Sequence, residues 1–406
     1  MSKTIIALLL AASAQLVSAQ EVVLRHSLTG ASLEKLTSLV TRFNEDQKGK
    51  GKIVLQDLAA AADKRQLPHL ALLDDDDARA FFDSVPRFKP IADVMKEGGQ
   101  KFDSAQFLPQ VADAVADVKG RAQALPMALA LPVLFYNKDA FTKAGLNPDA
   151  PPKTWMDTQK AAGKLSDADY NCPMTSSRFV WVHMENLSSQ HGQPVVVKEK
   201  KADRFVFNNL VQVKHLALLS SWQKASYFKY FGPGTEGDGK FLSGECAMLT
   251  GESSLFGQLK GAKFKVGMTL LPFYDDVYGV QPENVLPDGA ALWALPGKKK
   301  DEYAVAAKFI NFMLQPQVQR DWVRATGFLP MSSAALNELE AAGVSPSLVE
   351  AARKRLSMAR QPSSRMYAGP GRNRVRELLG EEVVHVWNDT KPAKEALDNA
   401  MARASK

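Results

Sequence analysis

Several groups of residues in this chain have side chains suited to ion binding or catalysis. Four consecutive aspartates, Asp74 to Asp77, could hold a calcium ion. They lack EF-hand spacing, and four consecutive side chains cannot all face one ion, so a strand end followed by a helix start is the better interpretation. The run from Gly232 to Gly239 resembles a phosphate-binding loop only in its glycine content. Because it lacks a GK[ST] ending, we interpret it as a surface loop.

The remaining candidates for catalysis do not form a motif. The six histidines include no HExxH pair, which excludes the usual metalloprotease motif. No GxSxG sequence occurs, so the commonest hydrolase motif is also missing. Carboxylate pairs could serve a glycosidase, but a sequence does not give their separation. We therefore expect a binding protein rather than an enzyme, without cofactor or metal, and keep a secreted glycosidase or phosphodiesterase, or a scaffold protein, as alternatives.

The chain has two cysteines, Cys172 and Cys246, which lie 74 residues apart. In an oxidising compartment they could form a disulfide. Free cysteines also pack well in an apolar core, so two buried thiols are the other possibility. The spacing does not decide between them, although the absence of a CxxC sequence argues against a redox motif or a zinc site.

An alternation of strands and helices would position these residues. The start of the chain predicts a strand at 21–28, a helix at 33–44, and strands at 52–55 and 70–73. This βαβ order predicts a parallel sheet, in which ligands bind at the carboxyl ends of strands, where His26, Ser27, Asp74 and Asp75 fall. Later segments predict strands at 132–136, 246–249, 264–268 and 290–295, and helices at 138–144, from 154, at 212–224, at 302–314 and over most of the chain after 336.

Length and composition limit the class of protein. The chain has 406 residues, a formal net charge of +7, 45% apolar and 23% charged residues, which fits two or three globular domains or two lobes of one fold. Basic residues are dispersed and no nucleic-acid-binding pattern occurs. Residues 1–19 have a basic start, an apolar stretch too short to cross a bilayer, and small residues before Gln20. This predicts a cleavable signal peptide, with a membrane anchor as the alternative.

One long stretch carries a family resemblance. Pro132 to Trp155 (PVLFYNKDAFTKAGLNPDAPPKTW) resembles the signature of periplasmic solute-binding proteins of ABC importers, in the carbohydrate-binding type of extracellular solute-binding protein family 1. Within that family, the similarity is greatest to members that bind sn-glycerol 3-phosphate. Further matching segments are 100–107, 241–248, 289–293, 309–330 and 381–387, so the resemblance spans nearly the whole mature chain.

The resemblance implies an α/β fold of two lobes, each a mostly parallel sheet flanked by helices, with the ligand in the cleft between them. It assigns 20–127 with 288–330 to lobe 1, and 128–287 with 331–406 to lobe 2. It implies a monomer in the periplasm that closes on its small-molecule ligand and delivers it to the permease and ATPase subunits at the inner membrane.

The family's site positions fall on charged and aromatic residues of this chain. The phosphate-binding arginine of the family falls on Arg376, and an Arg fork suits a phosphate through two parallel hydrogen bonds. The backbone-donor glycine falls on Gly289. One of two stacking tryptophans is Trp181, whereas the other position holds Arg178. An acidic residue that would hold glycerol hydroxyls falls on Asp75, or on Asp74 if the alignment shifts by one.

Other positions depart from the family. Hydroxyl-bearing residues are replaced by Ala130, Phe328 and Glu252, although Ser253 could substitute if the loop shifts, and the segment between Leu55 and Pro68 has no tyrosine. Three lost hydrogen bonds at about 1 kcal/mol each would weaken glycerol 3-phosphate binding about a hundredfold or more. Glu252 could instead pair with Arg376. The ligand alternatives are therefore glycerol 3-phosphate, a glycerophosphodiester whose cationic headgroup faces Trp181, and a neutral sugar or polyol.

Overall fold

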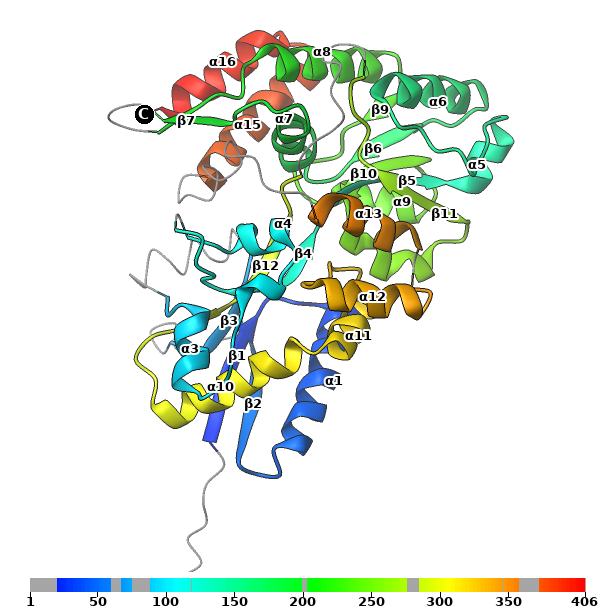
Figure 1. Cartoon of the computed structure of the whole chain (residues 1–406). Helices are drawn as coiled ribbons and strands as arrows, with labels where there is room; N and C mark the ends of the chain where they lie inside the picture. The colour runs from blue at the N-terminus through cyan, green and yellow to red at the C-terminus, as the bar shows by residue number, and fades with distance from the viewer. Residues whose placement is uncertain are drawn as a thin grey trace, which may run out of the picture.

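The computed structural model describes residues 20–59, 67–74, 88–117, 119–198, 203–275, 285–344, 346–357 and 372–405. Two five-stranded sheets with helices packed against them form a lower and an upper lobe in Figure 1. The predicted α/β class with two lobes is confirmed. Asp75 lies outside the described residues.

The first sheet has the strand order β2-β1-β3-β12-β4. Its β1 pairs in parallel with both neighbours, as the βαβ pattern predicts, whereas β12 is antiparallel to β3 and to β4. The sheet is therefore mixed rather than mostly parallel, because β12 enters from the other lobe and not through a βαβ crossover. The strands are β1 (Gln20–His26), β2 (Gly51–Asp57), β3 (Leu70–Leu73), β4 (Leu125–Ala130) and β12 (Asp288–Ala294).

The second sheet has the order β11-β5-β10-β6-β9 and is also mixed. Here β5 is antiparallel to β10 and to β11, whereas β6 is parallel to β10 and to β9. The strands are β5 (Pro132–Asn137), β6 (Met174–Ser176), β9 (Phe228–Lys229), β10 (Met248–Glu252) and β11 (Val266–Leu270), and a separate hairpin pairs β7 (Val196–Lys198) with β8 (Asp203–Phe205).

The chain passes directly from one sheet to the other at Leu131. This single residue separates β4 of the first sheet from β5 of the second. Both its N–H and its C=O are bound by Ser253, because the N–H donates to Ser253 Oγ at 3.0 Å and the C=O accepts from the Ser253 N–H at 2.8 Å. The lobe boundaries assigned from the sequence remain a prediction.

Helices cover both sheets. The apolar stripe predicted for the first helix is buried, with Leu36, Leu39, Val40 and Phe43 facing the core. Around the first sheet lie α1 (Gly30–Asp46), α3 (Ile91–Glu97), η1 (Ser104–Gln106), α4 (Pro109–Ala114), α10 (Lys300–Met313) and α11 (Pro316–Thr326). Associated with the second sheet are α5 (Lys138–Lys143), α6 (Trp155–Asp167), the π-helix η2 (Val180–Asn186), α7 (Leu187–Gln190), α8 (Leu210–Lys224), α9 (Glu236–Leu242), α15 (Arg372–Trp387) and α16 (Ala393–Ala404). The 3-10 helix η3 (Ser253–Gly261) follows β10 and contacts α11 and β4 of the first lobe as well as α9.

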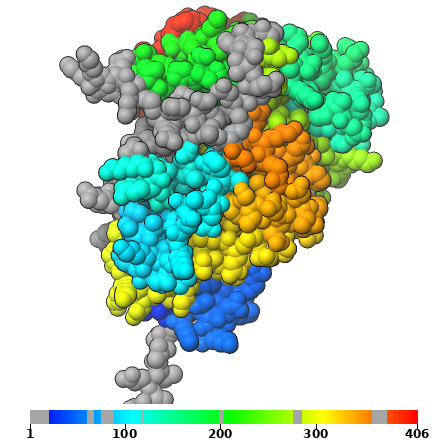
Figure 2. All heavy atoms as spheres, in the orientation of Figure 1, coloured from blue at the N-terminus to red at the C-terminus, as the bar shows by residue number. Residues whose placement is uncertain are grey.

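Two further helices, α12 (Ser333–Ala341) and α13 (Pro346–Leu356), lie between the lobes. In Figure 2 their orange surface adjoins both the yellow part of the lower lobe and the green part of the upper lobe. The α12 helix contacts α11 of the first lobe, and α13 contacts β11 of the second sheet. One continuous apolar cluster, here called the first core, therefore extends from the first sheet through α12 and α13 to one face of the second sheet.

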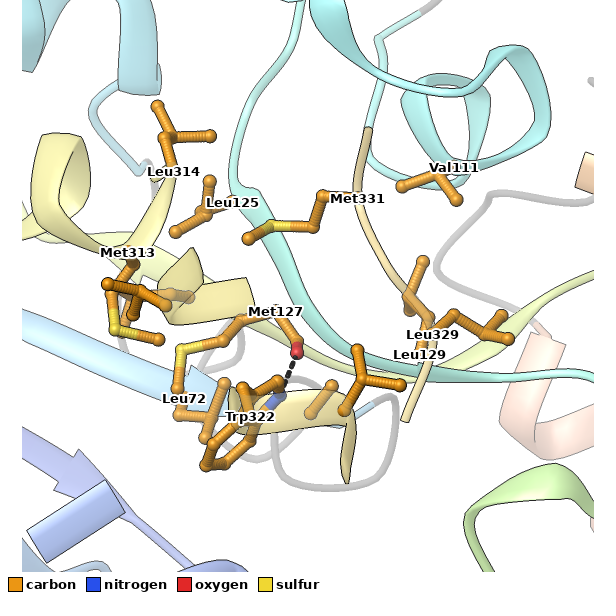
Figure 3. Packing of buried hydrophobic residues seen from close by; sticks show 14 of the residues in the cluster. Leu72, Val111, Leu125, Met127, Leu129, Met313, Leu314, Trp322, Leu329 and Met331 are labelled. Atoms are coloured by element: carbon orange, nitrogen blue, oxygen red, sulfur yellow. Dashed lines mark hydrogen bonds between the residues drawn. The ribbon is translucent and has the colours of Figure 1, made fainter. Parts of the chain in front are cut away.

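The first core is packed around strand β4. Figure 3 shows Leu125, Met127 and Leu129 of this strand against Trp322 of α11 and Met331. The buried indole of Trp322 donates to the Met127 carbonyl at 2.7 Å, so its one polar atom is satisfied. The cluster on the other face of the second sheet, here called the second core, contains Trp155 and Trp222 and is closed by α15 and α16.

Candidate ligand-binding site

A cavity of about 760 Å³ lies between the lobes. The first lobe contributes residues 27–32, which include the start of α1, together with Asp74 after β3, Gly289 of β12 and Phe328. Arg178, Gly234, Thr235, Glu252 and Arg376 contribute from the second lobe's side. Because β1 and β3 end at this cavity, it occupies the carboxyl edge of the parallel strands, where ligands bind in such sheets.

Arg178 is held in place by its backbone and by two carboxylates. It follows β6 with a left-handed backbone (φ 48°), and its N–H donates to the Gly234 carbonyl at 2.6 Å. A residue with a side chain adopts this conformation at some cost in energy, which the surrounding contacts must offset. Its guanidinium forms an ion pair with Glu252, and its Nη2 lies 2.7 Å from Asp288 Oδ2.

Arg376 extends from α15 and forms an ion pair with a fully buried carboxylate. Its Nε and Nη2 both donate to the carboxylate of Glu185, with Nη2 at 2.8 Å from Oε2. Glu185 is 0% exposed. The Nη2 atom also lies 2.6 Å from Asp288 Oδ2. A buried carboxylate needs a partner of this kind, because an unpaired charge in the core would be strongly destabilising.

Asp288 joins these two pairs into one network. We call Arg178, Arg376, Glu185, Glu252 and Asp288 the arginine–carboxylate network. Asp288 is 3% exposed and is the first residue of β12, so a carboxylate of the first sheet bridges two arginines of the second lobe. The network contains three carboxylates and two guanidinium groups. The suggestion that Glu252 pairs with Arg376 is wrong, since Glu252 pairs with Arg178 instead.

A further carboxylate lies next to this network. Asp238 of α9 accepts a hydrogen bond from Ser177 Oγ at 2.6 Å. Burial raises the pKa of Asp238 to about 6, although the Ser177 hydrogen bond and Arg178 act in the opposite direction. The α9 helix begins at Glu236, so the surface loop predicted from Gly232 to Gly239 is wrong in its second half. The first half of that run forms part of the cavity wall.

Trp181 lies beneath the cavity rather than in its wall. The side chain is 1% exposed, and its Nε1 donates to the Leu286 carbonyl at 2.9 Å. The guanidinium of Arg178 lies 4.9 Å from the centre of its ring, a cation–π distance. In this conformation the indole supports Arg178, and a ligand would reach Arg178 before Trp181.

The other predicted positions divide between the cavity and the crossing at Leu131. Gly289 and Phe328 line the cavity, as does Asp74, the alternative to Asp75. At Gly289 (φ 135°) a Cβ atom would lie 2.2 Å from the Ala128 carbonyl oxygen, so no side chain fits. Ala130 and Ser253 are buried, and Ala130 pairs with Asp288 across the first sheet.

Sequence reasoning missed two members of the network, Glu185 and Asp288. A signal existed for Glu185, since it stands four residues after Trp181 in the mainly apolar run VWVHMENL, where a solvated acid is unexpected. Glu185 belongs to the π-helix η2, and Asp288 lies close to it in the fold, because Asn186 of η2 accepts from the Leu286 N–H at 2.8 Å just before β12 begins. Single-turn π-helices occur frequently at functional sites.

The cysteines are joined in a disulfide, Cys172–Cys246. They precede β6 and β10, which pair in parallel with Met174 opposite Met248 and Ser176 opposite Thr250. The same offset of 74 residues separates Arg178 from Glu252. The disulfide therefore lies before the β6–β10 pair and the Arg178–Glu252 ion pair lies at its other end. Both join residues with the offset that the two paired strands have.

Across the described ranges, no helix is long and apolar enough to cross a membrane. Among the described residues, no group of three or more His, Cys, Asp or Glu side chains is arranged to hold a metal ion. Carboxylates at the cavity instead form ion pairs with Arg178 and Arg376.

The chain matches known proteins over most of its length. Relatives described as sn-glycerol-3-phosphate-binding periplasmic protein UgpB occur in Yersinia enterocolitica, at 33% identity over 98% of this chain and 94% of the relative, and in Salmonella typhimurium, at 32% over 98% and 95%. Among solved structures, Mycobacterium tuberculosis UgpB in complex with glycerophosphocholine is similar with a TM-score of 0.76 at 20% identity, over 95% of this chain and 98% of that one.

Sugar-binding proteins share the fold as well. The cyclic alpha-maltosyl-1,6-maltose binding protein of Arthrobacter globiformis is similar with a TM-score of 0.72 at 20% identity, over 95% of this chain and 98% of that one. A family model described as bacterial extracellular solute-binding protein matches residues 39–346. With two lobes, an interlobe cavity and relatives of this identity over nearly its full length, the chain belongs to the bacterial extracellular solute-binding proteins.

Proposed function

We propose that this protein is the substrate-binding component of an ABC importer for sn-glycerol 3-phosphate or glycerophosphodiesters. It would bind its ligand between the lobes without altering it chemically and deliver it to membrane permease and ATPase subunits. The observation that carries the proposal is the interlobe cavity bounded by Arg178 and Arg376 in a chain whose relatives at 32–33% identity are named for glycerol 3-phosphate. An arginine pair is the side-chain chemistry that a phosphate group requires.

The proposed contacts follow the predicted site. Arg376 and Arg178 would face the phosphate, Gly289 and Phe328 would form the wall of the first lobe, and Asp74 or Asp75 would accept from hydroxyls. Trp181 would act through Arg178, which covers its ring. For Ala130 and Ser253 we propose a role in the lobe crossing, because both are buried beside Leu131.

A periplasmic location and a monomeric state belong to the same proposal. The predicted signal peptide at 1–19 would direct export, and the Cys172–Cys246 disulfide is consistent with an oxidising compartment. The relatives in Yersinia enterocolitica and Salmonella typhimurium are named as periplasmic.

A neutral sugar or polyol is the second candidate ligand. It is favoured by one observation, namely that carboxylates already neutralise both arginines of the cavity. Carboxylates and guanidinium groups together suit hydroxyls, which both donate and accept hydrogen bonds.

Isothermal titration calorimetry with sn-glycerol 3-phosphate, glycerophosphocholine and ribitol tests the proposal. We expect at least one phosphorus-containing ligand to bind with a micromolar Kd or better. Arg376→Lys keeps the charge beside Glu185 but loses the fork, so it should weaken that binding at least tenfold. Arg353→Lys, on the exposed face of α13, is the matched control and should bind normally. Absence of binding to both phosphorus-containing ligands would reject the proposal, and binding of ribitol alone would establish the second candidate.

A further inference from the structure

We propose that Asp288 is an internal anion that sets the charge selectivity of the cavity. It selects a ligand that is neutral and polyhydroxylated, or whose phosphate is balanced by its own cationic group, over a phosphomonoester dianion. This inference rests on the proposed function, because it narrows the ligand class of the same cavity.

The Asp288 carboxylate already makes the contacts that a bound phosphate would make. One oxygen, Oδ2, lies 2.7 Å from Arg178 Nη2 and 2.6 Å from Arg376 Nη2. The other, Oδ1, accepts from the Gly289 N–H at 2.9 Å. One guanidinium nitrogen from each of two arginines and one backbone donor converge on a small anion, as such donors do at phosphate sites, and here the anion is a side chain of the protein.

Among the described residues, the rest of the network adds no spare positive charge. Arg178 also pairs with Glu252, and Arg376 also pairs with Glu185. Because these five side chains comprise three carboxylates and two guanidinium groups, together they carry one excess negative charge. Glu185 and Asp288 are buried, so solvent and salt screen them weakly. A phosphomonoester dianion in the same place would add like charge, which is unfavourable at close range in a partly desolvated site.

A different ligand would gain from the same groups. Hydroxyls can donate to carboxylates and accept from guanidinium groups, and a cationic headgroup is attracted by the excess negative charge. Asp74, after β3, adds another carboxylate to the wall of the cavity. A cavity of about 760 Å³ lies within the range that holds a disaccharide or a phosphodiester with its headgroup.

The decisive variant is Asp288→Asn, which keeps the shape of the side chain and an oxygen for the Gly289 N–H while removing one negative charge. Glu252→Gln is a second variant of the same network at a more exposed position. Asp157→Asn, on the exposed side of α6, changes the net charge of the protein by the same amount away from the cavity and is the matched control. Binding of sn-glycerol 3-phosphate, glycerophosphocholine and ribitol is measured by calorimetry for all four proteins, and circular dichroism verifies folding.

We expect Asp288→Asn to bind sn-glycerol 3-phosphate at least tenfold more tightly than wild type, with changes below threefold for glycerophosphocholine and ribitol. Glu252→Gln should act in the same direction by a smaller factor, and Asp157→Asn should match wild type. The inference is overturned if Asp288→Asn binds sn-glycerol 3-phosphate no more tightly, or if all three ligands change together. Should Asp288→Asn fail to fold, the same criteria apply to Glu252→Gln.

The two proposals fail in distinguishable ways. If wild type binds one of the phosphorus-containing probes but neither network variant gains affinity for sn-glycerol 3-phosphate, only the role of Asp288 is rejected. If wild type and both variants bind none of the three probes, the proposed function and this inference are rejected together.

Discussion

The two cores of this protein are stabilised by different interactions. Around Trp322, the first core consists of closely packed apolar side chains, with the indole hydrogen bond to Met127 as a local polar contact. The second core encloses a chain of hydrogen bonds, in which His183 contacts His215 at 2.9 Å and Thr250 at 2.8 Å, and His215 contacts Tyr274 at 2.9 Å.

This difference coincides with the position of the charged site. Arg178, Arg376 and Glu185 all come from elements that pack around the second core. Apolar packing tolerates small shifts, whereas a satisfied polar network fixes the relative position of the groups that form it. The lobe that supplies both arginines to the cavity is thus the one whose interior is held by directional hydrogen bonds.

The largest expected effect is on the first core. Trp322→Ala should lower the free energy of unfolding by about 3–5 kcal/mol, because it removes a buried indole and leaves a cavity against Met127 and Phe328. Urea unfolding followed by circular dichroism measures the change. Leu210→Ala, at an exposed position of α8, should change it by less than about 0.5 kcal/mol. Equal effects of the two variants would contradict the packing described for the first core.

The next effect concerns the covalent link beside the second core. Replacing both Cys172 and Cys246 by serine should cost about 2–4 kcal/mol, because a loop of 74 residues is no longer closed in the unfolded chain. Comparing unfolding of wild type with and without reductant checks the same quantity independently. A double variant as stable as oxidised wild type would show that the hydrogen bonds alone hold β6 and β10 together.

The buried histidines make the stability of the protein depend on pH. Burial lowers the pKa of His183 to about 3, and burial beside His183 and His191 lowers that of His215 well below its usual value. A histidine that stays neutral in the folded protein stabilises the fold fully above pH 6.5, which is the pKa of histidine in the unfolded chain. This contribution to stability is lost as the pH falls from 6.5 toward 3.

We therefore expect stability to fall below pH 6.5, with His183 contributing about 1.4 kcal/mol per pH unit. Urea unfolding at pH 7, 6 and 5 gives the slope. His183→Gln should reduce it, whereas His385→Gln, at an exposed position of α15, should keep it. Identical slopes for His183→Gln and wild type would mean that this group does not set the acid sensitivity.

The smallest expected effect on stability lies between the cores. Glu252→Gln should lower the free energy of unfolding by only about 1 kcal/mol, because its pair with Arg178 is partly exposed to water. Thermal unfolding measures this change, and an effect as large as that of Trp322→Ala would show that the network supports the fold rather than the cavity.

Local patterns predicted most elements but not their charged contacts. The helix over 33–44 and the strand over 132–136 lie where spacing and β-branched or aromatic residues indicate them, within a few residues. The short strands β6 and β9 have no local pattern, because they are defined by pairing with β10 and with each other. The disulfide was one of two open alternatives, since spacing does not report the distance between cysteines.

The site was predictable where one residue carries the signal. Gly289 and Phe328 line the cavity as expected from their segments. Glu185 and Asp288 were not predicted, because an acidic residue is expected at the surface unless a partner for it is known. The partner of Glu185, Arg376, lies 191 residues later in the chain. Burial of Trp181 under Arg178 was equally hidden, since both residues belong to a π-helix region with no distinctive spacing.

The shared offset along β6 and β10 also has a consequence for folding of the chain. Cys172 and Cys246 can meet only when the two strands are aligned as in the native sheet, and a shift by one residue would separate the thiols and also move Arg178 away from Glu252. Six residues separate each cysteine from its charged counterpart, or about 20 Å of strand. Formation of the disulfide therefore favours the alignment of β6 with β10 that also pairs Arg178 with Glu252.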